Sequence, residues 1–338
     1  IIIIFFESLS AYFIEDPEIR EHNLTPNIDE FIQQSLYFDR ILNAITPTLQ
    51  GQIAALSSSL HLYRSTMDEN KWSGFEDVKD QFNDREAPIV TVYPMLSTIL
   101  KDQSYTSTHI QGGAGGFGNT ERFFRLMGGY DHFYSASSKQ VAPNRQLPLG
   151  VWGASDIDTF GLATQWLLKD QQTPVLLAVS SIDIHHPYHT ESKKDGIDND
   201  LLNCVYSSDV GFGVFCDYFK QSPYKDNTIV VLTADHPIFP TADYLQLRKK
   251  QPSYYDYIPL AIYSPFHPRL MGIRDHTIGT NLDIPPTLLE LIGQNSKNAF
   301  LGLSLLSERK RYPHYVGRIN LEKRFNGNAV QWHDDDQA

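Results

Sequence analysis

Short apolar runs alternate with helix-forming segments along this chain, and this alternation restricts its fold more than any other feature. The run TIVVLTADHPIF, residues 228–239, shows the pattern: its apolar and β-branched residues predict a strand buried on both faces, ending at Asp235-His236. Strands are predicted at residues 1–6, 36–44, 105–111, 174–182, 228–234 and 258–264. Helices are predicted at residues 25–35, 49–60, 95–103, 120–128, 155–170, 200–220 and 281–293. Such alternation predicts an α/β fold: a mainly parallel central sheet with helices on both faces.

Local signals mark where several of these elements begin. Thr25 followed by Pro26 is typical of a helix start, and Ser155 occupies the capping position of another predicted helix. Residues 66–92 and 187–200 show neither the alternation of apolar and polar residues typical of a strand nor the three-to-four-residue repeat typical of a helix, and they are predicted to be loops.

Composition excludes several classes of protein. The 338 residues suffice for one large domain or two small ones, and no internal repeat or long linker separates them. A net charge of −12 and a pI of about 5.4 argue against a nucleic-acid-binding surface, so any phosphate chemistry should rely on a local cation. No apolar run approaches the roughly 20 residues that span a bilayer. Because IIIIFFE begins within a predicted strand and no initiator Met precedes it, we interpret the chain as part of a longer protein.

The two cysteines do not form a disulfide framework. Cys204 and Cys216 both fall in the helix predicted at 200–220, where twelve residues at a rise of about 1.5 Å separate them by roughly 18 Å. That distance exceeds the reach of a disulfide, so both should be buried thiols.

Side chains capable of chemistry collect at one predicted edge of the sheet. Glu7 ends the first strand, His185 and His186 follow the strand at 174–182, and Asp235-His236 end another. Thr48 lies between a strand and a helix. Taken singly, each is better explained as a cap, a turn or a loop residue. Together they lie where parallel sheets bind ligands, and their carboxylate, imidazole and hydroxyl groups suit Mn²⁺, Mg²⁺ or Zn²⁺.

Several motifs resemble one enzyme superfamily. TPNIDEFIQQSLYFDRILNAITPT, residues 25–48, resembles the opening of the sulfatase-like branch of the alkaline phosphatase superfamily, in which a Thr-Pro-Asn-hydrophobic-Asp signature precedes the nucleophile by a fixed interval. From Thr25 this interval leads to Thr48. ESLSAYFI, HIQGGAGGF, GGYDHFY, SIDIHHP and ADH are similar to the phosphoglycerol transferases, which include lipoteichoic acid synthases and the enzyme that modifies periplasmic glucans. The resemblance covers most of residues 1–295.

The resemblance implies a site and a domain. It implies one divalent metal ion, Mn²⁺ first with Zn²⁺ or Mg²⁺ as alternatives, and it assigns the ligands Glu7, Thr48, Asp235 and His236. Thr48 and His185 would be catalytic, Thr48 as nucleophile and His185 at the substrate phosphate or the leaving group. His185, His186, Gln111 and Arg122 would bind substrate. We expect a single sulfatase-like catalytic domain, residues 1–338, with a core of about 1–295 and a C-terminal segment, about 296–338, packed on it.

Three departures from the family patterns reduce the number of possible activities. Sulfatases carry Cys or Ser at the position of Thr48 and Arg four residues later, where this chain has Gln52, so sulfate-ester hydrolysis is disfavoured. Phosphoethanolamine transferases usually contain several disulfides, which two cysteines cannot supply. Lipoteichoic acid synthases hold glycerol phosphate with a Trp and an Arg where this chain has Gly118 and Thr120. Arg122 would then take the place of that Arg, and the identity of the head group stays open.

The residues themselves fit phosphoryl transfer. A threonine hydroxyl is a weak nucleophile that a metal ion can activate, and a helix beginning at Thr48 would favour an anionic phosphoryl group there. The neighbouring Thr46 is disfavoured as nucleophile because Pro47 holds it in an extended conformation.

The leading hypothesis is therefore a transferase that moves a phosphoglycerol-type head group from a phospholipid donor to a glycan or polymer hydroxyl through a covalent Thr48 intermediate. Its parent protein would be attached to a bacterial cytoplasmic membrane through a region before residue 1 and would act on the periplasmic or extracellular face. The alternatives are a phosphoethanolamine transferase, a soluble phosphodiesterase or sulfatase-like hydrolase, and a non-enzymatic binding domain, which the complete ligand set disfavours.

Overall fold

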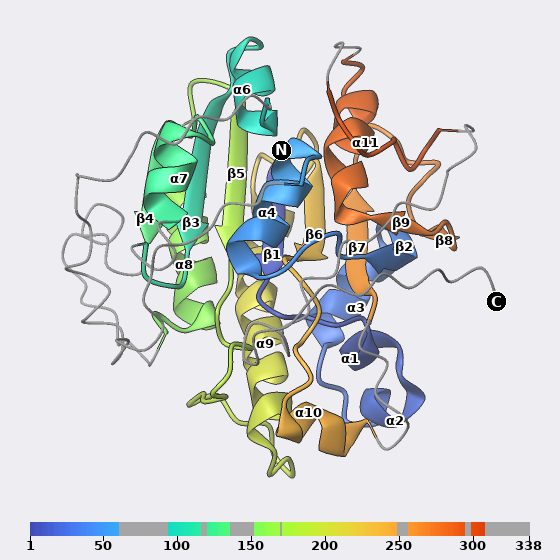
Figure 1. Ribbon diagram of the computed structural model, residues 1–338. Helices are drawn as coiled ribbons and strands as arrows, with labels where there is room; N and C mark the ends of the chain where they lie inside the picture. The colour runs from blue at the N-terminus through green and yellow to red at the C-terminus, as the bar shows by residue number, and fades with distance from the viewer. Residues whose placement is uncertain are drawn as a thin grey trace, which may run out of the picture.

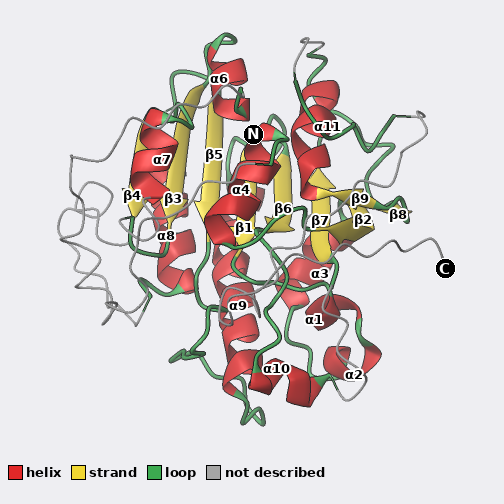
Figure 2. Cartoon of the chain, viewed as in Figure 1, coloured by secondary structure: helices red, strands yellow, loops and turns green. Residues whose placement is uncertain are grey.

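A nine-stranded sheet forms the centre of the protein (Figures 1 and 2). The computed structural model describes residues 1–60, 94–115, 120–135, 152–169, 171–248, 256–294 and 299–307. Its strands are β1 (Ile2–Phe6), β2 (Leu36–Leu42), β3 (Thr106–Gln111), β4 (His132–Ser135), β5 (Val175–Ser180), β6 (Val230–Ala234), β7 (Ile258–Tyr263), β8 (Arg274–Asp275) and β9 (Gly279–Thr280). They lie in the order β4-β3-β5-β1-β6-β7-β2-β8, with β9 also paired to β2.

The strands that carry the candidate site are parallel. β4, β3, β5, β1 and β6 pair in parallel, whereas β7 is antiparallel to both of its neighbours, β6 and β2. β1 lies in the middle of the sheet and all five of its residues are buried, which explains its continuous apolar sequence. The carboxyl ends of β5, β1 and β6 therefore meet at one edge.

The helices of the described residues pack around this sheet. They are α1 (Tyr12–Glu15), α2 (Pro17–Arg20), α3 (Pro26–Gln33), α4 (Thr48–Ser57), α6 (Leu96–Lys101), α7 (Thr120–Leu126), α8 (Asp156–Leu167), α9 (Asp200–Gln221), α10 (Ala242–Leu247) and α11 (Ile284–Leu291), which follows a 3₁₀ turn at Asn281–Asp283. α8 and α3 pack on α9, while α4 packs against α6 and α11 and crosses in front of the strands in Figure 1. Among the described residues, no helix has the length and apolar character needed to cross a bilayer.

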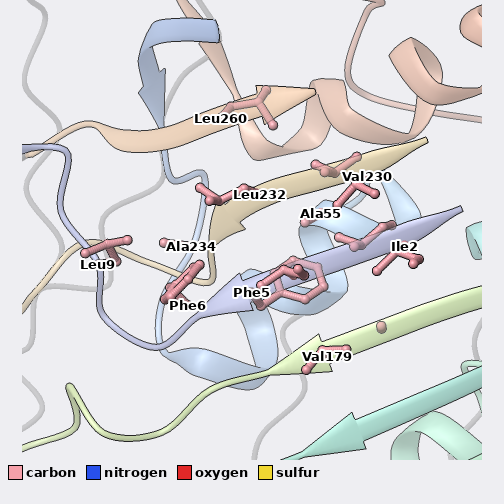
Figure 3. Packing of buried hydrophobic residues seen from close by; sticks show 14 of the residues in the cluster. Ile2, Phe5, Phe6, Leu9, Ala55, Val179, Val230, Leu232, Ala234 and Leu260 are labelled. Carbon is pink, nitrogen blue, oxygen red and sulfur yellow. The ribbon is translucent and has the colours of Figure 1, made fainter. Parts of the chain in front are cut away.

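Alternating side chains of β1 build the core. The Phe6 ring contacts Phe160 of α8 and Phe212 of α9, with centroid distances of 5.8 and 5.6 Å. Because successive strand residues face opposite sides of a sheet, Phe5 points to the other layer. Figure 3 shows both rings between Val179 of β5 and Leu232 of β6. Both phenylalanines are fully buried, and burial of such a side chain contributes about 1.5–3 kcal/mol to stability.

The fold class predicted from the sequence is confirmed, together with several local details. Ser155 caps α8 by accepting a hydrogen bond from the Asp158 N–H, and both cysteines are buried and unpaired. Residues 187–199 contain no helix or strand. The predicted loop at 66–92 lies outside the described residues.

The sequence missed some features of the fold. β4, α10 and the reversed direction of β7 were not predicted, because a short strand and an antiparallel neighbour have no distinctive sequence pattern. Thr25 precedes α3 as predicted, but its side chain does not cap the helix. Asp209 of α9 instead accepts hydrogen bonds from the N–H groups of Asn27 and Ile28.

The single-domain prediction stays a prediction. Within the C-terminal segment the structure describes residues 299–307, and these pack against the core. The Leu301 N–H donates to the carbonyl of Ser58 at 2.8 Å, and the Leu305 N–H donates to the hydroxyl of Thr287 at 2.8 Å.

Candidate active site

Two adjacent parallel strands bring Glu7 and Asp235 together. β1 and β6 pair in a register that places Phe6 opposite Ala234, so that the next residue of each strand is a carboxylate at the same edge. The Asp235 N–H also donates to the Phe6 carbonyl at 3.3 Å, which extends the pairing to the site. Glu7, Asp235 and His236 are all buried, and each offers a ligand atom within 4.8 Å of the other two.

Ser8 joins the two carboxylates. Its N–H donates to Asp235 Oδ1 at 2.9 Å and its hydroxyl donates to Glu7 Oε1 at 2.8 Å. Ser8 adopts a left-handed backbone conformation with φ 54°, which costs of order 1–3 kcal/mol in a residue with a side chain. Asp235 Oδ1 receives a second bond from the His236 N–H at 2.7 Å, whereas Asp235 Oδ2 is buried without a partner.

Thr48 reaches the same cluster from the first position of α4. Its Oγ1 lies 3.2 Å from Glu7 Oε2, to which it donates, and 3.4 Å from His236 Nε2. The Asn43 amide, in the segment that leads to α4, donates to the Asp235 carbonyl, and the Asn281 amide donates to the Gly51 carbonyl of α4 at 3.1 Å. These contacts fix Thr48 relative to β6.

The tautomer of His236 is set by the backbone. Its Nδ1 lies 2.8 Å from the Pro237 carbonyl, which can only accept a hydrogen bond, so Nδ1 carries the proton. The lone pair of neutral His236 is therefore on Nε2, which lies 3.6 Å from Glu7 Oε1 and 3.8 Å from Asp235 Oδ2. Phe239 stacks on the same ring at 4.4 Å.

The electrostatics of the cluster favour a cation. Burial, and next the neighbouring Asp235 carboxylate, hold the pKa of Glu7 well above its usual value. Glu7 and Asp235 offer ligand atoms within 4.8 Å of each other, and two buried carboxylates this close repel each other unless a positive charge lies between them.

The donor spacing fits a divalent ion. Metal–ligand bonds of about 2.0–2.2 Å in a tetrahedral site place ligand atoms about 3.3–3.6 Å apart. Thr48 Oγ1 lies 3.2 Å from Glu7 Oε2 and 3.4 Å from His236 Nε2. The same Nε2 lies 3.6 Å from Glu7 Oε1 and 3.8 Å from Asp235 Oδ2. Asp235 Oδ2, which is buried without a hydrogen-bond partner, and the lone pair of neutral His236 Nε2 are both available as metal ligands.

The other candidate residues lie on, or directly follow, three further elements of the fold. His185 and His186 follow β5, and burial lowers the pKa of His185, with smaller and opposing effects from His236 and Asp235. Gln111 ends β3, and its side-chain amide donates to the Ala114 carbonyl at 3.3 Å, which holds the Gly-rich turn. Arg122 lies near the start of α7, beyond β3. The structure thus brings Glu7, Thr48, Asp235 and His236 into direct proximity and leaves Arg122 farther out along the sheet.

Sequence reasoning missed the residues that orient the site. Ser8, Asn43 and Asn281 are of this kind. Ser8 directly follows Glu7 and gave a local signal, since a polar residue within an apolar segment at a strand end suggests a hydrogen-bonding role. Asn43 contacts Asp235, and Asn281 contacts Ala44, across long stretches of chain, so only the tertiary structure reveals these contacts.

Comparison with known proteins places the chain in a family. Residues 1–294 of the 338 match the Sulfatase family, and the chain belongs to it. It is 27% identical over 274 residues to phosphoglycerol transferase I of Xanthomonas axonopodis pv. citri, an alignment covering 69% of this chain and 37% of that protein. The chain therefore spans little more than a third of the length of this relative.

Solved structures share the fold. A protein of the alkaline phosphatase superfamily from Vibrio parahaemolyticus matches with a TM-score of 0.69 and 27% identity, over 92% of this chain and 70% of that one. The lipoteichoic acid synthase LtaP from Listeria monocytogenes matches with a TM-score of 0.69 and 18% identity, over 89% and 74% of the two chains. The fold is thus that of the alkaline phosphatase superfamily.

Proposed function

We propose that this chain is the catalytic part of a metal-dependent phosphotransferase that moves a phosphoglycerol-type head group from a phospholipid to a hydroxyl of a glycan or polymer. The observation that carries this proposal is the position of the Thr48 hydroxyl, 3.2 Å from Glu7 Oε2 and 3.4 Å from His236 Nε2 at the start of α4. The name and similarity of the Xanthomonas relative support the choice of phosphoglycerol as the transferred group.

The reaction takes two steps with Thr48 as the covalent carrier. In the first, Thr48 Oγ1 attacks the phosphorus of the donor in line and the bond from phosphorus to the diacylglycerol oxygen breaks. That oxygen keeps the electron pair and takes a proton from solvent. In the second, the acceptor hydroxyl oxygen attacks the same phosphorus, and the bond to Thr48 breaks. Glu7 Oε2 already accepts a hydrogen bond from the Thr48 hydroxyl, so it is placed to receive that proton as attack begins.

The metal and the helix would act on the developing charge. A divalent cation held by Glu7, Thr48, Asp235 and His236 would lower the pKa of the Thr48 hydroxyl and offset negative charge on the phosphoryl oxygens. The free N–H groups in the first turn of α4 point toward the same place, because Thr48 is the first residue of that helix. Mn²⁺ is the ion we propose first, with Zn²⁺ or Mg²⁺ as alternatives.

Four residues are proposed to contact the substrate: His185, His186, Gln111 and Arg122. Arg122 would pair with phosphate or glycerol oxygens, since a guanidinium can donate two parallel hydrogen bonds. His185 is proposed to be catalytic as well. We further propose that the parent protein is attached to a bacterial cytoplasmic membrane and acts on its periplasmic or extracellular face.

A reconstituted transfer assay tests this function. Metal-loaded protein is incubated with detergent-dispersed phosphatidylglycerol carrying a fluorescent acyl chain, together with a β-glucan acceptor. Release of fluorescent diacylglycerol and a mass increase of one phosphoglycerol on the glucan are expected, with both lost in Thr48→Ala and retained in Thr46→Ala. Release of glycerol phosphate without modification of any acceptor would instead identify a hydrolase, and turnover that persists in the presence of chelator would refute the metal-dependent mechanism.

A further inference from the structure

Trp152 covers the imidazole of His185. The two rings lie 3.9 Å apart between centroids, at an angle of 46°. The backbone that follows the indole is fixed, because Gly153 forms a β-bridge with Gly113 and the Ala154 N–H donates to the Gly112 carbonyl at 3.0 Å. A Cβ on Gly153 would lie 2.0 Å from the Gly112 carbonyl oxygen, so this close contact requires glycine. The Gly-rich turn after β3 therefore determines where the indole lies.

A backbone carbonyl sets the tautomer of His185. Its Nδ1 lies 2.7 Å from the His186 carbonyl oxygen, and because a carbonyl only accepts, Nδ1 carries the proton. In the neutral ring the lone pair is then on Nε2. His236 shows the same arrangement with the Pro237 carbonyl.

The surroundings of His185 keep the ring neutral. Burial lowers the pKa of His185 to about 4, and the nearby His236 acts in the same direction. Asp235 and the hydrogen bond to the His186 carbonyl raise the pKa of His185, but burial is the largest influence. A divalent cation at the neighbouring cluster would add positive charge and favour the neutral ring further.

A neutral His185 with its lone pair on Nε2 cannot donate a hydrogen bond from Nε2 to a phosphate oxygen. It can accept a hydrogen bond, and then the proton, from a hydroxyl group. In the two-step reaction proposed above, a hydroxyl group with a proton to lose enters the site in the second step, as the acceptor.

We propose that His185 is the general base for the acceptor hydroxyl, and that Trp152 is the positioning residue that holds its imidazole with Nε2 available for this role. The inference rests on the proposed function. As the acceptor oxygen forms its bond to phosphorus, its proton passes to Nε2 and the bond from phosphorus to Thr48 Oγ1 breaks. The electron pair of that bond stays on Oγ1, which takes back the proton that Glu7 received in the first step. The imidazolium then returns its proton to solvent.

Rapid-quench kinetics separate the two steps. In His185→Gln we expect a burst of about one diacylglycerol per enzyme, followed by turnover slowed about 10²-fold, with the phosphoglyceryl adduct accumulating on the protein. Trp152→Ala should show the same accumulation to a smaller degree, and Trp152→Phe, which retains an aromatic ring over His185, should restore transfer. A loss of the burst itself in His185→Gln would place His185 in the first step and overturn the proposal.

A spectroscopic measurement does not depend on turnover. In protein labelled with ¹⁵N-histidine and loaded with diamagnetic Zn²⁺, the signals absent from His185→Gln identify His185. We expect the shifts of a neutral ring protonated on Nδ1 at neutral pH, and in Trp152→Ala a mixture of tautomers. A ring protonated on Nε2, or an imidazolium, in the wild-type protein would contradict the inference. Failure of the proposed function is distinguishable, because wild-type protein would then form neither adduct nor product.

Discussion

Gly51 and Asp235 lie in direct backbone contact. A Cβ built on Gly51 would come within 1.9 Å of the Asp235 carbonyl oxygen. Gly51 belongs to the first turn of α4, which begins at Thr48, and Asp235 directly follows β6. The absence of a side chain at Gly51 is therefore what allows the helix carrying the proposed nucleophile to approach the strand carrying two proposed metal ligands.

Substitution Gly51→Ala should consequently separate Thr48 from the cluster. The backbone oxygen cannot move freely because Asn43 also donates to it, so α4 must shift by about 1 Å, and a misplacement of that size can lower activity about 10²-fold. The matched control is Gly161→Ala in α8, where an added Cβ meets nothing within 4 Å. Steady-state transfer rates for both variants check the prediction, which wild-type activity in Gly51→Ala would contradict.

The four proposed ligands should bind one divalent ion and gain stability from it. At an ion concentration 100 times its dissociation constant, the free energy of unfolding should rise by about 2.7 kcal/mol. Asp235→Ala should bind no ion and show no gain, because it removes the unpartnered Oδ2. Asp209→Asn, at a buried carboxylate that caps α3, is the control and should keep about one equivalent of metal by elemental analysis. If Asp235→Ala bound as much metal as the wild-type protein, the ion would be bound elsewhere.

Arg122→Ala should weaken binding of glycerol phosphate about tenfold or more without changing metal content, because a charge-assisted hydrogen bond contributes about 1.5–3 kcal/mol. Arg125→Ala serves as the control for the loss of an arginine from the same helix, where Arg125 pairs with Glu121 at 2.8 Å. Calorimetric titration of both variants gives the comparison. Should the two variants bind glycerol phosphate equally well, Arg122 is not a contact.

His109 should make folding sensitive to acid. Burial lowers its pKa to about 3, whereas an exposed histidine in the unfolded chain titrates near 6.5. Between these values the unfolded state binds the extra proton, so stability falls as the pH is lowered, by up to about 1.4 kcal/mol per pH unit. His109→Gln should remove this one-proton slope between about pH 6 and pH 4, as measured by urea unfolding. An unchanged slope in the variant would show that His109 is not the group responsible.

The sequence allowed the fold class and the central residues of the site to be predicted for a physical reason. Buried parallel strands are continuous apolar runs, so Glu7 and Asp235 stand out where those runs end, and parallel pairing then places strand ends at one edge. Thr48 was predicted from the family interval and from the helix that follows it, and α4 does begin at Thr48.

What the sequence could not supply was the orientation of these side chains. The proton on Nδ1 of His236 depends on the Pro237 carbonyl, and the position of Thr48 depends on Asn281, whose contact with Gly51 joins residues far apart in the chain. The pairing of Trp152 with His185 likewise requires the Gly-rich turn after β3 to fold back on residues 152–154. Such contacts between distant segments carry no local periodicity and become visible only in three dimensions.

The central claim is that Thr48 carries the transferred group, and mass spectrometry of protein quenched during turnover tests it most directly. Metal-loaded wild-type protein acting on phosphatidylglycerol should show the added mass of one phosphoglyceryl group, which peptide mapping places on Thr48. Thr46→Ala should still form this adduct. Thr48→Ala should form none while keeping its fold, since the hydrogen bond that the Thr48 hydroxyl donates to Glu7 is worth only about 0.5–1.5 kcal/mol. An adduct on Thr46, or wild-type turnover in Thr48→Ala, would contradict the account.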